Sequence, residues 1–341
     1  MTAQEITADA GRPGDPGRSR FDKAARHDFV TTNFGVLSIS AVFVVLFAFF
    51  SIQADAFLST DNLVNVGRQI APTVIVAVAM TFVITTGAID LSVGSIVGLT
   101  AAALAIFAES GNAVVALAMT LVIGLGIGLI NGALTAFGKL QSFIVTLAAL
   151  TAVRGVALLI TDGYSTPITS DFLLPLGQGQ LLGLYTPTWI AIATVALGWW
   201  VFTQTKFGRY IVAVGSNAES LRRAGVDIRR IQMAALALTG LFAGLAGVIT
   251  AARLASGSSI SGTMFELEVI TAVVLGGTSL MGGRGSIIGS AIGALTLGII
   301  SNGLVLLKVD VYWVPIVQGL ILVVAIFLNS KVFSRVTGTR T

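Results

Sequence analysis

The sequence predicts an all-α protein, a polytopic transmembrane bundle of about ten helices with the N- and C-termini in the cytoplasm. Of the 341 residues, 55% are hydrophobic and only 11% are charged, and the mean hydropathy is +0.92. A soluble domain carries roughly 25% charged residues. Unbroken apolar runs reach about 20 residues, whereas the strands of a membrane barrel alternate over about 10 residues. Helices are therefore the expected spanning elements.

Successive apolar runs predict the individual spans. In chain order they are residues 30–50, 70–86, 90–108, 113–136, 142–160, 187–205, 231–252, 264–280, 286–306 and 312–329. Residues 1–29 are rich in Gly, Pro, Asp and Arg, which predicts a flexible N-terminal tail. Residues 30–330 then form the transmembrane domain, and residues 331–341 form a C-terminal tail. An even number of spans places both termini on the same side.

The basic residues predict which side this is. Arg68, Arg253 and Lys308 fall on one face, and Arg154 lies within a span. The other face has many more, because it receives Arg12, Arg18, Arg20, Lys23, Arg26, Lys139, Lys206, Arg209, Arg222, Arg223, Arg229, Arg230, Arg284, Lys331, Arg335 and Arg340. Cytoplasmic loops carry the excess of Lys and Arg, so both termini are expected in the cytoplasm.

Two connections are longer than tethers between helices, which usually have 2 to 8 residues. Residues 161–186 face outward, contain no Lys or Arg, and are expected to pack over the mouth of the bundle. Residues 206–230 face the cytoplasm and form the largest polar island between spans. We expect the second connection to hold a docked element.

Several classes of function are excluded by missing residues. The chain has no cysteine, and its one histidine, His27, lies in the N-terminal tail. The sequence Gly138-Lys139-Leu140 lacks the hydroxyl residue and the upstream glycine of a phosphate-binding loop. We therefore expect no enzyme activity, no metal site and no bound cofactor. The net charge of +4 follows from topology, so a nucleic-acid partner is not expected either.

Ionisable residues at membrane depth are candidates for function, because burying a charge there is costly. They are Asp90, Arg154, Glu266 and Glu268. Asp90 lies in the stretch TTGAIDLSVGSIVG, residues 85–98, which predicts a break between two short spans at Gly87. Asp90 is expected either to cap the following helix by accepting N–H bonds from Ser92 and Val93, or to bind a ligand. Arg154 is expected to have an internal partner such as Asp90.

Glycines recur at helical spacing and predict close helix packing, although they would also suit the lining of a pore. Gly94 and Gly98 give the helix after the break a small-residue face. The other sets are Gly124, Gly126, Gly128 and Gly132; Gly240, Gly244 and Gly247; and Gly289 and Gly293.

Four segments carry a family resemblance. They are GAIDLSVGSIVGLTAA, INGALTAFGKLQSFIVTLAALTAVRGVA, VGSNAESLRRAGVDIRRIQMAALALTGLFAGLAGVI and ITAVVLGGTSLMGGRGSIIGSAIGAL. In this order they resemble the membrane permease subunits of ribose-type monosaccharide ABC importers. The resemblance runs from about residue 34 to residue 330, almost the whole chain outside the tails.

The resemblance implies a transmembrane permease subunit of an ATP-driven importer for ribose, xylose, galactose or a related sugar. It implies residence in the bacterial cytoplasmic (inner) membrane and a pathway that works by alternating access. ABC ATPase subunits would dock in the cytoplasm and use the ATP, an extracytoplasmic sugar-binding protein would deliver the substrate, and a second permease copy or a paralogue would complete the pathway. An ion-coupled secondary sugar transporter or a channel is the alternative.

The resemblance also places site residues on this chain. A cytoplasmic coupling helix is expected near residues 217–225, capped by Ser216 or Asn217 at its start and by Gly225 at its end. The residues assigned to ATPase coupling are Asn217, Ala218, Glu219, Leu221, Arg222, Arg223 and Gly225, although the arginines would also serve topology alone. Asp90, Asn131, Thr146 and Asn302 are assigned to the sugar pathway, where each would also suit a bond to a neighbouring helix. Arg68, Arg253 and Glu266 are assigned, with the 161–186 loop, to docking of the binding protein.

Overall fold

The computed structural model describes residues 16–109, 111–310 and 312–324, and most of them lie in helices. The helices are α1 (Pro16–Gln53), α2 (Thr60–Thr85), α3 (Val93–Ala108), α4 (Ala113–Ala136), α5 (Ser142–Thr161), α6 (Pro175–Gln178), α7 (Thr186–Gln204), α8 (Lys206–Arg223), α9 (Ile228–Leu254), α10 (Phe265–Leu275) and α11 (Ile287–Leu306). The described residues also form two antiparallel pairs of two-residue strands. β1 (Thr166–Pro167) pairs with β4 (Ser256–Gly257), and β2 (Gln180–Leu181) pairs with β3 (Leu184–Tyr185). Apart from these short strands, the all-α prediction is confirmed.

Each predicted apolar run falls on a helix, but the helices differ in length. Within the described part of the chain, 7 helices are long and apolar enough to cross a membrane: Gly35–Gln53 of α1, α2, α4, α5, α7, α9 and α11. Among the described residues, two apolar helices are shorter, α3 and Trp313–Val324. The helix α10 has only 11 residues and includes Glu266 and Glu268. A bundle of membrane-spanning helices is therefore confirmed, whereas the number of ten spans and the side of the termini stay predictions.

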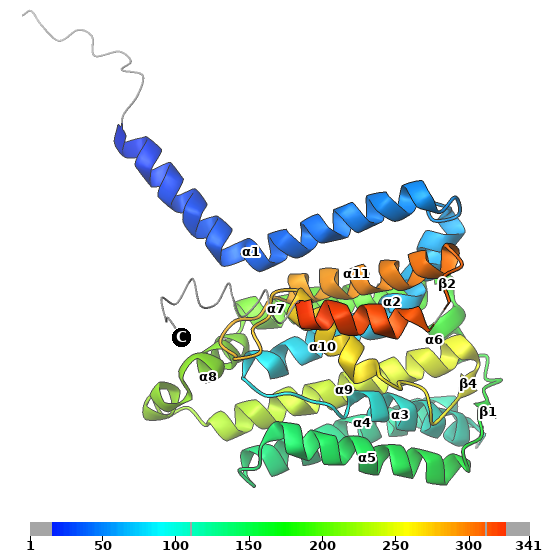
Figure 1. Cartoon of the computed structure of the whole chain (residues 1–341). Helices are drawn as coiled ribbons and strands as arrows, with labels where there is room; N and C mark the ends of the chain where they lie inside the picture. Colours follow the sequence, from blue (N-terminus) through cyan, green and yellow to red (C-terminus); the bar gives the residue numbers. More distant parts are fainter. Residues whose placement is uncertain (1–15, 110, 311, 325–341) are drawn as a thin grey trace, which may run out of the picture.

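The first helix extends into the predicted tail. It begins at Pro16, so residues 16–29 have a helical backbone. Proline suits the first turn of a helix, because its fixed φ is helical and the N–H that it lacks would have no partner there. Figure 1 shows α1 as two segments that meet at an angle, and α1 contacts α11. Residues 1–15 and the predicted C-terminal tail, 331–341, lie outside the described residues.

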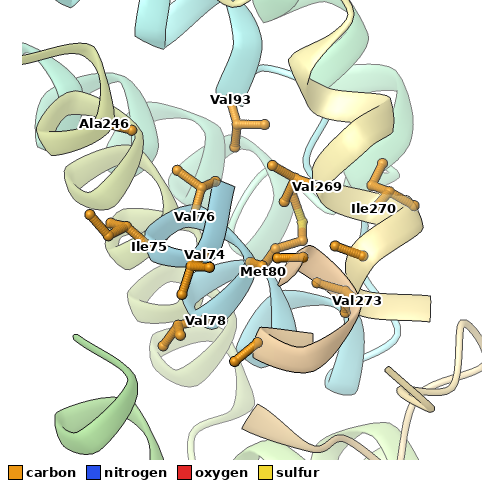
Figure 2. Close-up of a cluster of buried hydrophobic side chains, with 14 of the residues drawn as sticks. Val74, Ile75, Val76, Val78, Met80, Val93, Ala246, Val269, Ile270 and Val273 are labelled. Atoms are coloured by element: carbon orange, nitrogen blue, oxygen red, sulfur yellow. The ribbon is translucent and has the colours of Figure 1, made fainter. Parts of the chain in front are cut away.

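The second helix is the centre of the bundle. Of its most apolar window, 83% is buried inside the protein, compared with 11% for α1. It packs against α7, α9, α10 and α11. Figure 2 shows Val74, Ile75, Val76 and Met80 of α2 among side chains of α3, α9 and α10, which come from distant parts of the sequence. A helix that is apolar on all sides is typical of such a central position.

Glycines bring α4 and α9 close together. A Cβ atom on Gly124 would stand 2.5 Å from the carbonyl oxygen of Gly240, and one on Gly128 would stand 3.0 Å from the Gly240 Cα. A Cβ on Gly126, one of the same predicted set, would have nothing within 4 Å. The packing interpretation is therefore confirmed for Gly124, Gly128 and Gly240, because each faces the backbone of the neighbouring helix.

The substitution Gly240→Ala is expected to destabilise the bundle. Its methyl group would press on backbone atoms of α4, which cannot rotate aside, and overpacking of this kind costs about 1–3 kcal/mol. Gly126→Ala is the matched control, expected to leave stability unchanged or slightly raised, since alanine favours a helix over glycine. Thermal unfolding of the purified variants in detergent measures the difference, and equal stability of the two would contradict the expectation.

The two long connections lie at opposite ends of the bundle. Figure 1 shows α8 at one end and β1, β4, α6 and β2 at the other. Within residues 161–186, β1 pairs with β4 and α6 packs against α9, where Gln178 donates its Nε2 hydrogen bond to the carbonyl of Ala252 at 3.1 Å. The expectation that this connection packs over the end of the bundle is confirmed.

Candidate functional site

A break separates α2 from α3. Gly87 has a φ of +83°, its N–H donates to the carbonyl of Ile84 at 2.9 Å, and the N–H of Ala88 donates to that of Val83 at 3.3 Å. This pair of bonds is typical of a helix that ends with a glycine after its last turn. The predicted interruption at Gly87 is confirmed.

Asp90 lies in the break and binds Ser92, the residue directly before α3. Its side chain is 0% exposed, and its Oδ1 accepts hydrogen bonds from the backbone N–H of Ser92 at 2.9 Å and from the Ser92 hydroxyl at 2.6 Å. The predicted bond from the Val93 N–H is not formed, because Ser92 donates both bonds to this oxygen. Asp90 therefore lies beside the start of α3 as expected, but the N-cap is Ser92, and of the two expected donors only the Ser92 N–H bonds to Asp90.

Other helices send polar side chains to the same break. Asn131 of α4 donates its Nδ2 hydrogen bond to the Ser92 hydroxyl at 2.9 Å. Thr146 of α5 donates to the Ile89 carbonyl at 3.2 Å, and the Ile89 N–H donates to the Ser142 hydroxyl at 3.1 Å. Three of the predicted pathway residues therefore come together. The resulting break cluster consists of Asp90, Ser92, Asn131, Ser142 and Thr146.

The second carboxylate oxygen of Asp90 is the open acceptor of the break cluster. Oδ2 is buried and accepts no hydrogen bond within the described ranges. The hydroxyl of Thr239 of α9 is the nearest further donor to the carboxylate, and it also has the carbonyls of Ala235 and Leu236 at 3.0 and 3.1 Å. A buried carboxylate oxygen without a donor is unfavourable, so Oδ2 has the capacity for one further hydrogen bond.

Two substitutions at Asp90 should separate the contribution of its hydrogen bonds to stability from the contribution of its negative charge. Asp90→Ala removes the acceptor for both Ser92 donors, and we expect it to lower the free energy of unfolding by about 2 kcal/mol or more. Asp90→Asn keeps an oxygen at Oδ1 and is expected to cost less than about half of that. Thermal unfolding in detergent checks the order, and a larger loss for the asparagine variant would contradict a stabilising role of the two hydrogen bonds from Ser92.

Asn302, the fourth predicted pathway residue, lies elsewhere. On α11 it forms a reciprocal amide pair with Asn62 near the start of α2, with Nδ2–Oδ1 distances of 3.0 and 2.9 Å. Asn62 belongs to the first turn of α2, whereas the break follows its last turn. Since α2 has 26 residues, the amide pair and the break cluster are about 35 Å apart along its axis. Asn302 therefore connects two helices and has no contact with the break cluster.

Arg154 of α5 has internal partners, as expected, but they are backbone carbonyls and not Asp90. Its guanidinium donates to the carbonyl oxygens of Ser259, Ser261 at 2.9 Å and Gly262 at 3.2 Å, all in the segment before α10. Gly98 of α3 makes room for it, because a Cβ there would stand 2.5 Å from Nη1. The fork of the guanidinium suits several acceptors at once.

Glu266 of α10 lies against the other glycine of α3. The side chain is 9% exposed, and a Cβ on Gly94 would overlap its Oε2, which has no hydrogen-bond partner among the described residues. The predicted role of Glu266 in docking a binding protein is therefore corrected, because the residue is buried between α10 and α3. The small-residue face of α3 likewise receives charged side chains and irregular backbone, where a packed helix was expected.

Arg68 and Arg253 lie at the end of the bundle that carries the short strands. The guanidinium of Arg68 is 4.3 Å from the centre of the Tyr185 ring and donates to Asn65 Oδ1 at 2.8 Å. Arg253 donates to the carbonyl of Gln69 at 3.2 Å. Both side chains are half-buried, so each has a structural contact and an exposed part.

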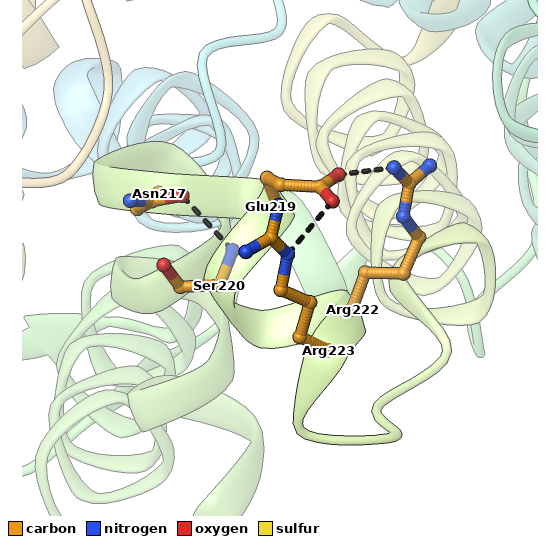
Figure 3. Close-up of polar contacts among 5 residues, drawn as sticks. All are labelled: Asn217, Glu219, Ser220, Arg222 and Arg223. Atoms are coloured by element: carbon orange, nitrogen blue, oxygen red, sulfur yellow. Dashed lines mark hydrogen bonds and ion pairs between the residues drawn. The ribbon is translucent and has the colours of Figure 1, made fainter.

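The predicted coupling helix is the second segment of α8. The backbone of Asn217 leaves the helical region, with φ −158° and ψ 87°, and its Oδ1 accepts the N–H of Ser220 at 3.0 Å. At the other end Gly225 has a φ of +81°, and its N–H donates to the carbonyl of Arg222 at 3.0 Å. The predicted caps, Asn217 and Gly225, are confirmed. Figure 3 shows the ion pairs of Glu219 with Arg222 and Arg223 on this segment.

The residues assigned to ATPase coupling are not all exposed. Ala218, Glu219, Arg222 and Arg223 are exposed, whereas Leu221 packs against the core of the bundle. Ala218 and Leu221 both follow the kink at Asn217, and only Leu221 reaches the core of the bundle. Leu221 therefore anchors the segment, and the exposed residues around Ala218 form its free surface.

Sequence reasoning missed several residues of these sites. Ser92 was expected to offer only its backbone, although its hydroxyl joins Asp90 to Asn131. Ser142, Asn62 and Tyr185 were not expected to take part. For Ser142 a signal was present, since it is a hydroxyl residue one helical turn before Thr146.

The bundle, the buried polar break at the end of α2 and the exposed polar segment of α8 define a multi-pass membrane protein. Among the described residues, no group of acidic or histidine side chains has the arrangement of a metal site. Comparison with known proteins agrees with this class. Residues 62–326 match the family described as the branched-chain amino acid transport system / permease component, and the chain belongs to this family.

Curated relatives cover most of the chain. It is 41% identical over 295 residues to the ribose import permease protein RbsC of Escherichia coli K12, covering 84% of this chain and 91% of the relative. It is 40% identical over 293 residues to the RbsC protein of Bacillus subtilis, with coverage of 84% and 90%. It is 34% identical over 362 residues to the xylose transport system permease protein XylH of E. coli K12, with coverage of 87% and 92%. No solved structure matches the chain.

Proposed function

We propose that this chain is the membrane permease subunit of an ATP-driven ABC importer for a monosaccharide. The observation that carries the proposal is the similarity to ribose and xylose permeases, which extends over more than four fifths of the chain. Such a subunit is not an enzyme, and it resides in the bacterial inner membrane. An ion-coupled secondary transporter or a channel is not favoured.

The break cluster is the proposed part of the pathway. Asp90, Asn131 and Thr146 bring hydrogen-bonding groups to a buried position within an apolar bundle, which suits a neutral, polyhydroxylated substrate. The open acceptor, Asp90 Oδ2, supports this role. In the proposed cycle the bundle of about ten spans, with both termini in the cytoplasm, alternates between an outward and an inward opening.

Partners occupy the two ends of the bundle in this proposal. An ABC importer works with ATPase subunits and an extracytoplasmic binding protein. The ATPase is proposed to dock on the exposed face of residues 217–225, and it uses the ATP while this chain binds no cofactor. The binding protein is proposed to dock at the opposite end, near Arg68, Arg253 and the 161–186 loop. A second permease copy, identical or paralogous, completes the pathway.

Reconstitution tests the proposal. The chain is inserted into proteoliposomes alone, and then together with its ATPase and its binding protein, with radiolabelled D-ribose, D-xylose and D-galactose as probes. Uptake of one of the sugars is expected only in the complete system and only with ATP. Uptake by the chain alone, with or without an ion gradient, would favour the secondary transporter or the channel.

A further inference from the structure

Three distant segments meet directly before the coupling segment. They are the end of α2 (residues 85–87), residues 215–216 of α8, and the loop of residues 279–285 between α10 and α11. The N–H of Gly283 donates to the carbonyl oxygen of Thr85 at 2.8 Å. Thr85 is the last residue of α2, and its carbonyl has no donor within the helix itself. We name this contact the glycine junction, and it consists of Thr85, Gly87, Gly215, Gly282 and Gly283.

The junction is a contact of backbone against backbone. A Cβ on Gly215 would overlap the carbonyl oxygen of Thr85 and the nitrogen of Gly283. A Cβ on Gly282 would stand 2.9 Å from the nitrogen of Gly87 and 3.1 Å from the Cα of Gly215. At Gly215 and Gly282 the segments touch through backbone atoms, and the short Ser216 side chain beside Gly283 leaves little that is flexible to absorb a displacement of one segment against another.

The loop of residues 279–285 is held in shape by hydrogen bonds between its own backbone groups. The N–H of Ser279 donates to the carbonyl of Arg284 at 3.0 Å, and the N–H of Gly282 donates to that of Ser279 at 3.0 Å. Gly282 and Gly283 have φ values of +81° and +77°, a region that residues with a side chain rarely adopt. The loop therefore presents a fixed surface to α8.

The junction lies between the two sites described above. Gly215 is two residues before Asn217, where the coupling segment starts, and Gly87 is three residues before Asp90 in the break cluster. The chain thus has a path of backbone contacts from the surface proposed for the ATPase to the polar break proposed for the pathway.

We propose that the glycine junction transmits the movement of the coupling segment to the break between α2 and α3, with Gly215 as its central positioning residue. This rests on the proposed coupling role of residues 217–225. A push on the coupling segment moves Gly215, which bears directly on the end of α2. The same contact carries a change at the break back to the ATPase.

The substitution Gly215→Ala tests this in the complete transporter. Its methyl group separates the segments without touching the exposed face of residues 217–225. We expect ATPase binding and basal ATP hydrolysis to be retained, while ATP-dependent sugar uptake falls by about tenfold or more. Hydrolysis would then no longer respond to the loaded binding protein. Gly126→Ala, with open space around its Cβ, is the matched control and is expected to transport normally.

The outcomes distinguish the inference from the proposed function. Unchanged uptake per ATP hydrolysed in the Gly215→Ala transporter overturns the inference alone. If an acidic substitution of Ala218 leaves ATPase binding and uptake intact, the coupling assignment fails and the inference falls with it. A parallel loss of yield, ATPase binding and uptake in Gly215→Ala would indicate a role of Gly215 in folding. A distance measurement on a protein that keeps Gly215 then decides whether the junction transmits movement.

Spin labels supply that measurement. The chain has no cysteine, so Arg209→Cys in α8 and Met281→Cys in the loop provide two unique labelling positions, both exposed and both outside the surface of residues 217–225 that is proposed to bind the ATPase. We expect the same distance distribution in the assembled transporter without nucleotide and with a non-hydrolysable ATP analogue, because the two segments move together. A shift of the distribution between the two states would overturn the proposal.

Discussion

Ala218→Glu is expected to abolish sugar uptake and binding of the ATPase, while the chain still inserts into the membrane. Ala218 is exposed, next to the kink at Asn217, on the free face of the proposed coupling segment. A glutamate there adds bulk and an unpaired charge to a contact surface, which costs several kcal/mol when the surface becomes buried. Co-purification of the ATPase and ATP-dependent uptake measure the two effects.

The same change at the opposite end of the bundle is the matched control. Ala56 is also exposed, in the turn before α2. Ala56→Glu is expected to leave ATPase binding at the wild-type level. If both variants bind the ATPase equally well, residues 217–225 are not its docking surface. Leu221 is unsuitable for this test because it packs against the core, so its replacement would damage the bundle itself.

Arg154→Met is expected to give the largest loss of stability. It removes the donors for the carbonyls of Ser259, Ser261 and Gly262 and leaves Glu266 without the nearby positive charge. Buried acceptors without donors and a buried charge without a counter-charge are both costly, so we expect a loss of about 3 kcal/mol or more in the free energy of unfolding. Thermal unfolding in detergent measures it.

Arg223→Met provides the comparison for Arg154. Its guanidinium is exposed and pairs with Glu219 at the surface of the same protein. Surface ion pairs contribute about 0–1 kcal/mol, so this variant should unfold near the wild-type temperature. Arg154→Lys keeps the charge but loses the fork, and an intermediate loss is expected. A stability of Arg154→Met equal to that of Arg223→Met would contradict the assigned role.

The sequence predicted the features that depend on local pattern. Apolar runs gave the helices, and Gly87, Asn217 and Gly225 marked real helix ends, because caps and left-handed glycines act within a few residues. The side of the bundle on which a polar residue would find its partner was not predictable in this way. Asn302 and Asn62 are 240 positions apart, and only the packing of α2 against α11 brings them together.

The spacing of the glycines predicted that another part of the chain would approach each helix closely, but it did not predict which part. Gly124 and Gly240 meet helix backbone, as expected, whereas Gly94 and Gly98 accommodate Glu266 and Arg154. A glycine only removes a side chain, so the same pattern serves a helix, a loop or a charged group. For the same reason nothing in the sequence alone indicated that Gly215 meets the end of α2.

Because α3 is enclosed by other helices, it should not respond to changes in the thickness of the bilayer. This helix has 16 residues, a length of about 24 Å against a hydrocarbon thickness of about 30 Å. Its residues from Val93 to Ala105 are all buried, with α4, α5 and α9 packed around it. A helix without a lipid-facing side does not have to match the bilayer. A change in acyl-chain length therefore acts on the helices with the most exposed apolar surface, α1, α4, α5 and α7, and the break cluster is insulated from hydrophobic mismatch.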